Sequence, residues 1–163
     1  MISFFDSSYN RGMIQEMQIT NFKKMIKENE FVHLSGNVLI LTDRLCKLGK
    51  ELSLYIKNNT NANTKGVVST IEDINVSSFE KTNIDYLIIV GYLENTEGYK
   101  VIDILRSLNR NIKTVQWALL DDYISTIEMK YKISFKFDRL QPPKEFINYL
   151  SEIKNKSDRE CNL

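Results

Sequence analysis

The sequence contains a single histidine, His33, and only two cysteines, Cys46 and Cys161. One histidine cannot build a site with several imidazole ligands, which argues against a histidine-rich metal centre. His33 lies in the apolar stretch FVHL, so we expect a packed structural side chain and not a catalytic one. Cys46 is expected beside the apolar face of a helix, as a buried thiol and not a nucleophile.

Strong charge and long apolar runs are also missing. The net charge is +1, which gives no broad attraction to nucleic acid or to a membrane. No apolar run is long enough to span a bilayer. The first residues, MISFFDSSYNRG, lack the basic start and apolar stretch of a signal peptide, which favours a reduced, cytoplasmic setting. Neither a G-x-G-x-x-G motif nor a Walker loop occurs, and we expect no cofactor.

What the sequence does contain is a regular alternation of short apolar stretches and stretches with helical spacing. The apolar stretches are NVLIL (37–41), GVVST (66–70), DYLIIV (85–90), KTVQWALL (113–120) and ISFKF (133–137). The stretches expected to be helical are residues 44–57, 71–81, 99–109, 121–132 and 142–154. Five strand–helix pairs predict right-handed crossovers and a doubly wound α/β domain, a parallel five-stranded sheet with helices on both faces.

Residues 1–36 precede this alternation and are expected to form an extra N-terminal helix. Ile19, Phe22 and Ile26 form an apolar stripe at helical spacing. The stripe either covers part of the chain's own domain or pairs with another subunit or partner. We expect three parts: a helical extension over residues 1–36, an α/β domain over residues 37–154 and a polar tail over residues 155–163.

Three short motifs within residues 37–154 resemble response-regulator receiver domains. In VGYLENTEGY, Glu97-Gly98 stands where that family has Asp-Gly after its third strand. FDRLQPPKEF resembles the family's Lys-Pro-Phe segment, and ALLDDYI its passage from strand four into helix four. The resemblance implies a flavodoxin-like sheet with strand order 2-1-3-4-5.

The resemblance also places the family's functional positions on residues that cannot do the same chemistry. The phosphoacceptor aspartate falls on Val90, which has no oxygen. The acidic pair that holds Mg²⁺ falls on Thr42 and Asp43, so half of it remains. The hydroxyl residue that ends strand four falls on Trp117. We therefore expect a degenerate pocket, filled by Val90 and Trp117 packing across the strand ends.

Two further positions leave alternatives open. The family's lysine after strand five falls on Arg139, with Lys136 as the other candidate, and Arg139 either pairs with Asp43 or lies on the surface. Asp43 is a weak metal candidate, because an aspartate after a strand more often caps the following helix. Glu94 and Glu97 could join Asp43 in a rebuilt cation site, although acidic loop residues are usually solvated.

Aromatic residues mark the expected interaction surface. In receivers, the face formed by helix four, strand five and helix five is the usual dimer surface. On this face the sequence places Tyr123, Tyr131, Phe135 and Tyr149. Trp117 is expected as core or pocket filler, with a role as an anchor for a partner as the alternative.

These observations favour a pseudo-receiver, a non-enzymatic signalling or regulatory module that works through protein–protein contacts. Its partner is a protein, and a homodimer is one such arrangement. The alternative is a flavodoxin-like domain that binds a small ligand or acts as an enzyme. A flavin phosphate loop needs closely spaced small and hydroxyl residues, whereas TDRLCKLGK has Thr42 and is otherwise bulky or basic.

Overall fold

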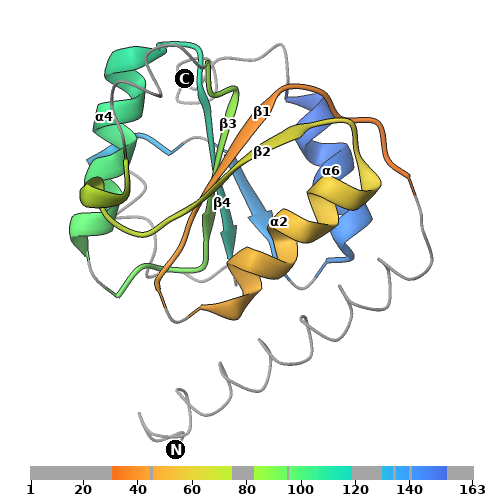
Figure 1. Cartoon of the computed structure of the whole chain (residues 1–163), viewed down its shortest axis with the longest axis horizontal. Coiled ribbons are helices and arrows are strands. Elements are labelled where there is room, and N and C mark those ends of the chain that lie inside the picture. The colour runs from red at the N-terminus through yellow and green to blue at the C-terminus, as the bar shows by residue number, and fades with distance from the viewer. Residues whose placement is uncertain are drawn as a thin grey trace, which may run out of the picture.

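The computed structural model contains one parallel five-stranded sheet with helices on both sides (Figure 1). It describes residues 31–44, 46–74, 83–94, 96–118, 130–133, 135–139 and 141–153. The strands are β1 (Asn37–Leu41), β2 (Asn63–Val68), β3 (Tyr86–Val90), β4 (Lys113–Ala118) and β5 (Phe135–Asp138). They lie in the order β2-β1-β3-β4-β5, and every neighbouring pair is parallel. The predicted doubly wound sheet and its strand order are confirmed.

Three α-helices cover the sheet in the described part of the chain. They are α2 (Lys47–Asn59), α4 (Lys100–Leu108) and α6 (Pro143–Glu152). Figure 1 shows α2 and α6 on one face and α4 on the other. Pro143 occupies the first helical turn of α6. Proline is tolerated there, because an N–H group at this position would have no acceptor within the helix.

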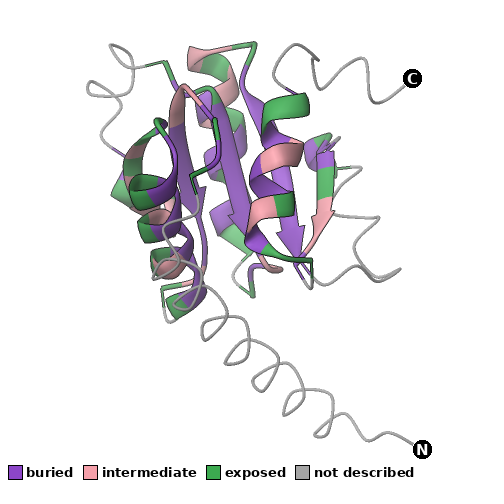
Figure 2. Cartoon of the chain, turned by 90° about the vertical axis from the view of Figure 1, so that its right-hand side faces the viewer, coloured by how far each residue is buried: buried purple, intermediate pink, exposed green. Residues whose placement is uncertain are grey.

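Two apolar cores follow from the pleat of the central strands. Alternate residues of β1 and β3, such as Ile40 and Ile88, face α2 and α6 in one cluster, here called the α2/α6 core. Their neighbours Leu39 and Ile89 face α4 in a second cluster, the α4 core. Figure 2 shows the central strands buried along their length and the helices exposed on their outer sides.

The start of the described chain belongs to the domain and not to a separate extension. Val32 and Leu34 are buried in the α2/α6 core, and the Val32 N–H donates to the Asn59 carbonyl at 2.7 Å. His33 between them is exposed, so the expectation of a packed histidine is wrong. Its two apolar neighbours are buried, and His33 between them faces solvent.

Several predicted features lie outside the described residues. They include the apolar stripe Ile19, Phe22 and Ile26, most of the helix predicted over residues 121–132 with Tyr123, and the polar tail. Of the helix predicted over residues 71–81, the structure describes one 3₁₀ turn, Ile71–Asp73. No described helix combines the length and apolar character needed to cross a membrane.

Candidate functional site

The candidate site lies where β3, β4 and β5 end at the same edge of the sheet, where open α/β folds usually place their ligands. Val90 ends β3 and lies in register with Trp117 of β4. The two side chains are 3% and 1% exposed and belong to the α2/α6 core. At the position that the resemblance gives to a phosphoacceptor, the chain therefore has a buried aliphatic side chain.

Trp117 is held in place by aromatic neighbours on α6 and β5. Its ring stacks on Phe146 of α6 with 5.3 Å between the centroids. Phe146 also contacts Phe137 of β5 at 5.4 Å in a tilted arrangement. Offset and tilted aromatic pairs of this kind add to the free energy gained from burial alone. The indole lies inside the core, which agrees with its expected role as filler and leaves no exposed face for a partner.

Arg139 lies at the same edge and is buried, 7% exposed. Its backbone N–H donates to the Ala118 carbonyl at 3.0 Å. Gly91 adopts φ of +72°, and a Cβ there would stand 3.2 Å from Nη1 of Arg139. Lys136 is exposed within β5, so Arg139, and not Lys136, occupies the strand-end position. The expectation of a surface arginine is wrong, because its guanidinium lies against the end of β3.

The side chain of Asp43 contacts the loop after β3, whereas its backbone carbonyl accepts from the N–H of Cys46, the N-cap of α2, at 3.0 Å. Its Oδ2 accepts a hydrogen bond from the Glu94 N–H at 3.2 Å. Helix α2 begins after Cys46 without any side-chain cap, so the capping expectation for Asp43 is wrong. Within the described residues, no ion pair joins Asp43 to Arg139. Burial raises the pKa of Asp43 above its ordinary value, and the nearby Glu94 charge acts in the same direction.

Two residues that sequence reasoning missed hold the same loop. The Tyr99 hydroxyl accepts a hydrogen bond from the Leu93 N–H at 3.0 Å, and burial raises the pKa of Tyr99. The Gln116 side-chain amide donates to the Gly91 carbonyl. A glutamine inside the apolar strand KTVQWALL was the available signal, because a buried amide needs partners.

Thr42, which stands at the first position of the family's acidic pair, is 2% exposed. Its N–H donates to the Val68 carbonyl at 3.0 Å. In the described part of the chain, no three acidic, histidine or cysteine side chains gather closely enough to hold a metal ion. Glu97, the other carboxylate considered for a cation site, is exposed and pairs with Lys100 at 2.6 Å.

The predicted aromatic interface is not one exposed face. Phe135 is 2% exposed in the α2/α6 core, whereas Tyr131 is 7% exposed in the α4 core and stacks on Tyr99 at 5.4 Å. The two side chains lie in separate cores, and neither is available to a partner. Tyr149 is half-buried and contacts Phe137 at 5.2 Å. Cys46 is half-buried too, and not fully buried as expected.

Comparison with known proteins identifies the fold. No family model matches the sequence, and no curated protein matches it. A two-component response regulator of the LuxR family from Aurantimonas matches with TM-score 0.56 and 10% identity, over 74% of this chain and 86% of that one. A CheY-like receiver domain protein from Methanospirillum hungatei matches with TM-score 0.54 and 12% identity, over 78% and 99%.

A third match is to a protein whose structure contains a phosphorylated residue. It is a response regulator from Burkholderia pseudomallei with a phosphorylated aspartic acid, a calcium ion and citrate, with TM-score 0.55 and 12% identity, over 77% of this chain and 72% of that one. Identities this low establish the fold and not the activity. The chain has the receiver-domain fold.

Proposed function

We propose that this chain is a pseudo-receiver, a non-catalytic signalling module that works through protein contacts and without phosphorylation. The observation that carries the proposal is Val90, buried in register with Trp117 at the end of β3. Phosphoryl transfer needs a nucleophilic oxygen and a metal ion to neutralise charge. Val90 offers no such oxygen, and Asp43 alone is a poor site for a cation that requires several oxygen ligands.

The loop after β3 supports a module held in one state. Three side chains make hydrogen bonds to this loop. They belong to Asp43 after β1, Gln116 of β4 and Tyr99 before α4. None of the three bonds depends on a phosphoryl group or a metal. A switch needs two arrangements of similar free energy, and these bonds favour one of them at all times.

In this proposal the module acts by binding another protein chain. The predicted apolar stripe over residues 19–26 must be removed from water, by its own domain or by another chain. We infer that it is covered by another chain, either a second copy or a different protein. Val32 and Leu34 already belong to the α2/α6 core, so the interaction segment ends before them.

The test replaces Val90 with aspartate. A carboxylate beside Trp117 should destabilise the fold by on the order of 3 kcal/mol, or be met by a raised pKa. The variant should melt below the parent and take up no phosphoryl group from acetyl phosphate with Mg²⁺, as judged by intact mass. Val90→Asn is the matched control, because asparagine has nearly the same shape as aspartate but no nucleophilic carboxylate. An aspartate variant that melts like the parent and gains mass, while the asparagine variant does not, would refute the closed pocket.

A further inference from the structure

Tyr99 contacts two parts of the chain that are distant in sequence. Its hydroxyl accepts a hydrogen bond from the Leu93 N–H, in the loop after β3, at 3.0 Å. Its ring stacks on Tyr131, just before β5, with 5.4 Å between the centroids and 23° between the planes. Both side chains are buried in the α4 core, at 0% and 7% exposure. Because protein cores are close-packed, we expect a shift of one ring to displace the other.

Tyr131 is itself held by Arg106, which lies in the last turn of α4. The Arg106 guanidinium donates through Nη1 to the Tyr131 carbonyl and through Nη2 to the Lys132 carbonyl, the latter at 2.8 Å. The backbone is helical at Lys130 and Tyr131, and the last carbonyls of a helical segment find no donor within that segment. Arg106 supplies these donors from a different helix and so fixes where the segment ends.

The backbone of the turn before β5, residues 131–133, is strained at Lys132. Its φ is +54°, in the left-handed region that residues with a Cβ rarely adopt. Such a conformation persists only where its surroundings hold it. The two hydrogen bonds from Arg106 fall on the carbonyls of Lys132 and of the residue before it. The turn therefore has a second, unstrained arrangement, which these bonds disfavour.

The two ends of this series of contacts lie at opposite edges of the sheet. All neighbouring strands are parallel. The loop that follows β3 therefore lies at the carboxyl edge, whereas the turn that precedes β5 lies at the amino edge. The stacked pair Tyr99 and Tyr131 joins them through the α4 core.

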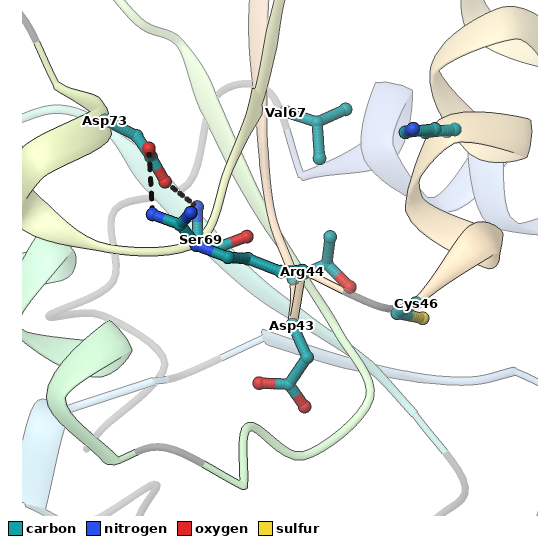
Figure 3. Close-up of a pocket in the computed structure, with 8 residues that line it drawn as sticks. Asp43, Arg44, Cys46, Val67, Ser69 and Asp73 are labelled. Atoms are coloured by element: carbon teal, nitrogen blue, oxygen red, sulfur yellow. Dashed lines mark hydrogen bonds and ion pairs between the residues drawn. The ribbon is translucent and has the colours of Figure 1, made fainter.

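At the carboxyl edge, Asp43 holds the next peptide group of the same loop. Its Oδ2 accepts from the Glu94 N–H at 3.2 Å, one residue beyond the N–H that Tyr99 holds. Asp43 also lines a hollow at the ends of β1 and β2, where its carboxylate points away from Asp73 (Figure 3). A displacement of Tyr99 therefore acts on a loop that is tied to the neighbouring strand end.

We propose that Tyr99 and Tyr131 couple the loop after β3 to the turn before β5, so that a rearrangement of either changes the other. Coupling of this kind is reciprocal. Lys132 is exposed, so a contact that rearranges the turn there changes the loop at the opposite edge without any phosphoryl group. This inference does not rest on the pseudo-receiver proposal, because none of these contacts involves Val90 or Trp117.

The test perturbs the turn and measures the loop. Arg106→Gln in the full chain leaves a side chain that cannot serve both carbonyls, so amide exchange at Leu93 should accelerate about threefold or more. Exchange at Ile88, in the centre of β3, should change by less than about twofold. The measurement is hydrogen exchange followed residue by residue. Arg110→Gln, at an exposed arginine just after α4, is the matched control, because it removes the same charge and should leave exchange at Leu93 unchanged.

Tyr131→Leu tests whether the effect passes through the ring. Leucine keeps an apolar side chain in the core and removes the stack on Tyr99, so this variant alone should accelerate exchange at Leu93. Adding Arg106→Gln should then change that exchange by less than about twofold. Unchanged exchange at Leu93 in Arg106→Gln, equal acceleration at Ile88, or additive effects of the two substitutions would each overturn the proposal. If Tyr131→Leu does not fold, Arg106→Gln and its control decide.

Discussion

Asp43 is a carboxylate in a place where burial works against its charge. Its pKa is raised above the ordinary value of 3.8, mainly by burial, although the Glu94 N–H hydrogen bond acts in the opposite direction. A raised pKa in the folded state means that the native protein holds the proton more tightly than the unfolded chain. The contribution of Asp43 to stability is therefore largest below pH 3.8 and is lost as pH rises through the folded-state pKa.

Asp43→Asn should remove this pH dependence while keeping an acceptor for Glu94. We expect the variant to melt above the parent at neutral pH, and the difference to shrink as pH falls towards 4. Thermal melts at a series of pH values measure this. Asp103→Asn, at an exposed carboxylate of α4, controls for the loss of one negative charge. A variant that melts below the parent at every pH would show that the charge itself stabilises the site.

Tyr86 is a second residue at which burial dominates. Its side chain is 1% exposed, its hydroxyl has no partner among the described residues, and burial raises its pKa to about 12. Because the unfolded chain ionises first, near the ordinary value of 10, the parent should lose stability between pH 10 and pH 12.

Tyr86→Phe should raise the free energy of unfolding by about 1 kcal/mol, because it removes a buried polar group that has no partner. The variant should also lack the loss of stability that Tyr86 causes above pH 10. Denaturant melts at pH 7 and pH 11 measure both effects. Tyr99→Phe should have the opposite effect and lower the free energy of unfolding, because it leaves the Leu93 N–H without its acceptor. A loss of stability in Tyr86→Phe would mean that its hydroxyl has a partner.

At the scale of elements, sequence patterns predicted the buried strands β1 and β3 well and the edge strand β2 poorly. β1 and β3 are short, apolar and rich in β-branched residues, so their positions were clear from periodicity. β2 was expected over residues 66–70 and is observed at Asn63–Val68. Its first residues are polar and pair with β1 through backbone groups, which leave no apolar pattern in the sequence.

The site was predictable only in part, for a related reason. Motif resemblance placed Val90 and Trp117 at neighbouring strand ends, and parallel pairing then brought them into register. The burial of Arg139, and the hydrogen bonds of Tyr99 and Gln116 to the loop, depend on contacts between elements distant in sequence. A glutamine within an apolar strand indicates that its amide needs partners, but no local pattern indicates which residues those partners are.

Tyr99→Phe should loosen the loop after β3 without unfolding the sheet. Loss of its acceptor leaves the Leu93 N–H without its present hydrogen bond, so amide exchange at Leu93 should accelerate about tenfold. Exchange at Leu87 and Ile88, in the centre of β3, should change much less. The measurement is hydrogen exchange followed residue by residue. Equal acceleration in the strand would indicate global destabilisation and not a local restraint on the loop.

At the scale of the whole molecule, residues just before β1 contribute to the core of the domain. Val32 and Leu34 fill the α2/α6 core, whereas the predicted apolar stripe lies upstream, within residues 1–30. Large apolar side chains contribute about 1.5–3 kcal/mol each when fully buried. We propose that the stripe supports association with another chain and is not needed for folding.

If the stripe joins two copies of the chain, as we propose, deletion of residues 1–30 should give a monomer with an unchanged melting temperature. Light scattering gives the oligomeric state and calorimetry the melt. Deletion of residues 1–36 is the control, and it should melt lower because it removes Val32 and Leu34 from the core. If the full chain is monomeric and the shorter deletion already unfolds, the stripe belongs to the domain's own core.

We propose that this chain has the receiver fold without the phosphorylation chemistry. Intact mass after incubation of the full chain with acetyl phosphate and Mg²⁺ tests this most directly, because it detects a covalent gain and ignores reversible binding. We predict no gain, since Val90 offers no oxygen and the described residues provide no cluster of metal ligands. A stable gain that disappears in Asp43→Asn would contradict the account and identify Asp43 as the acceptor.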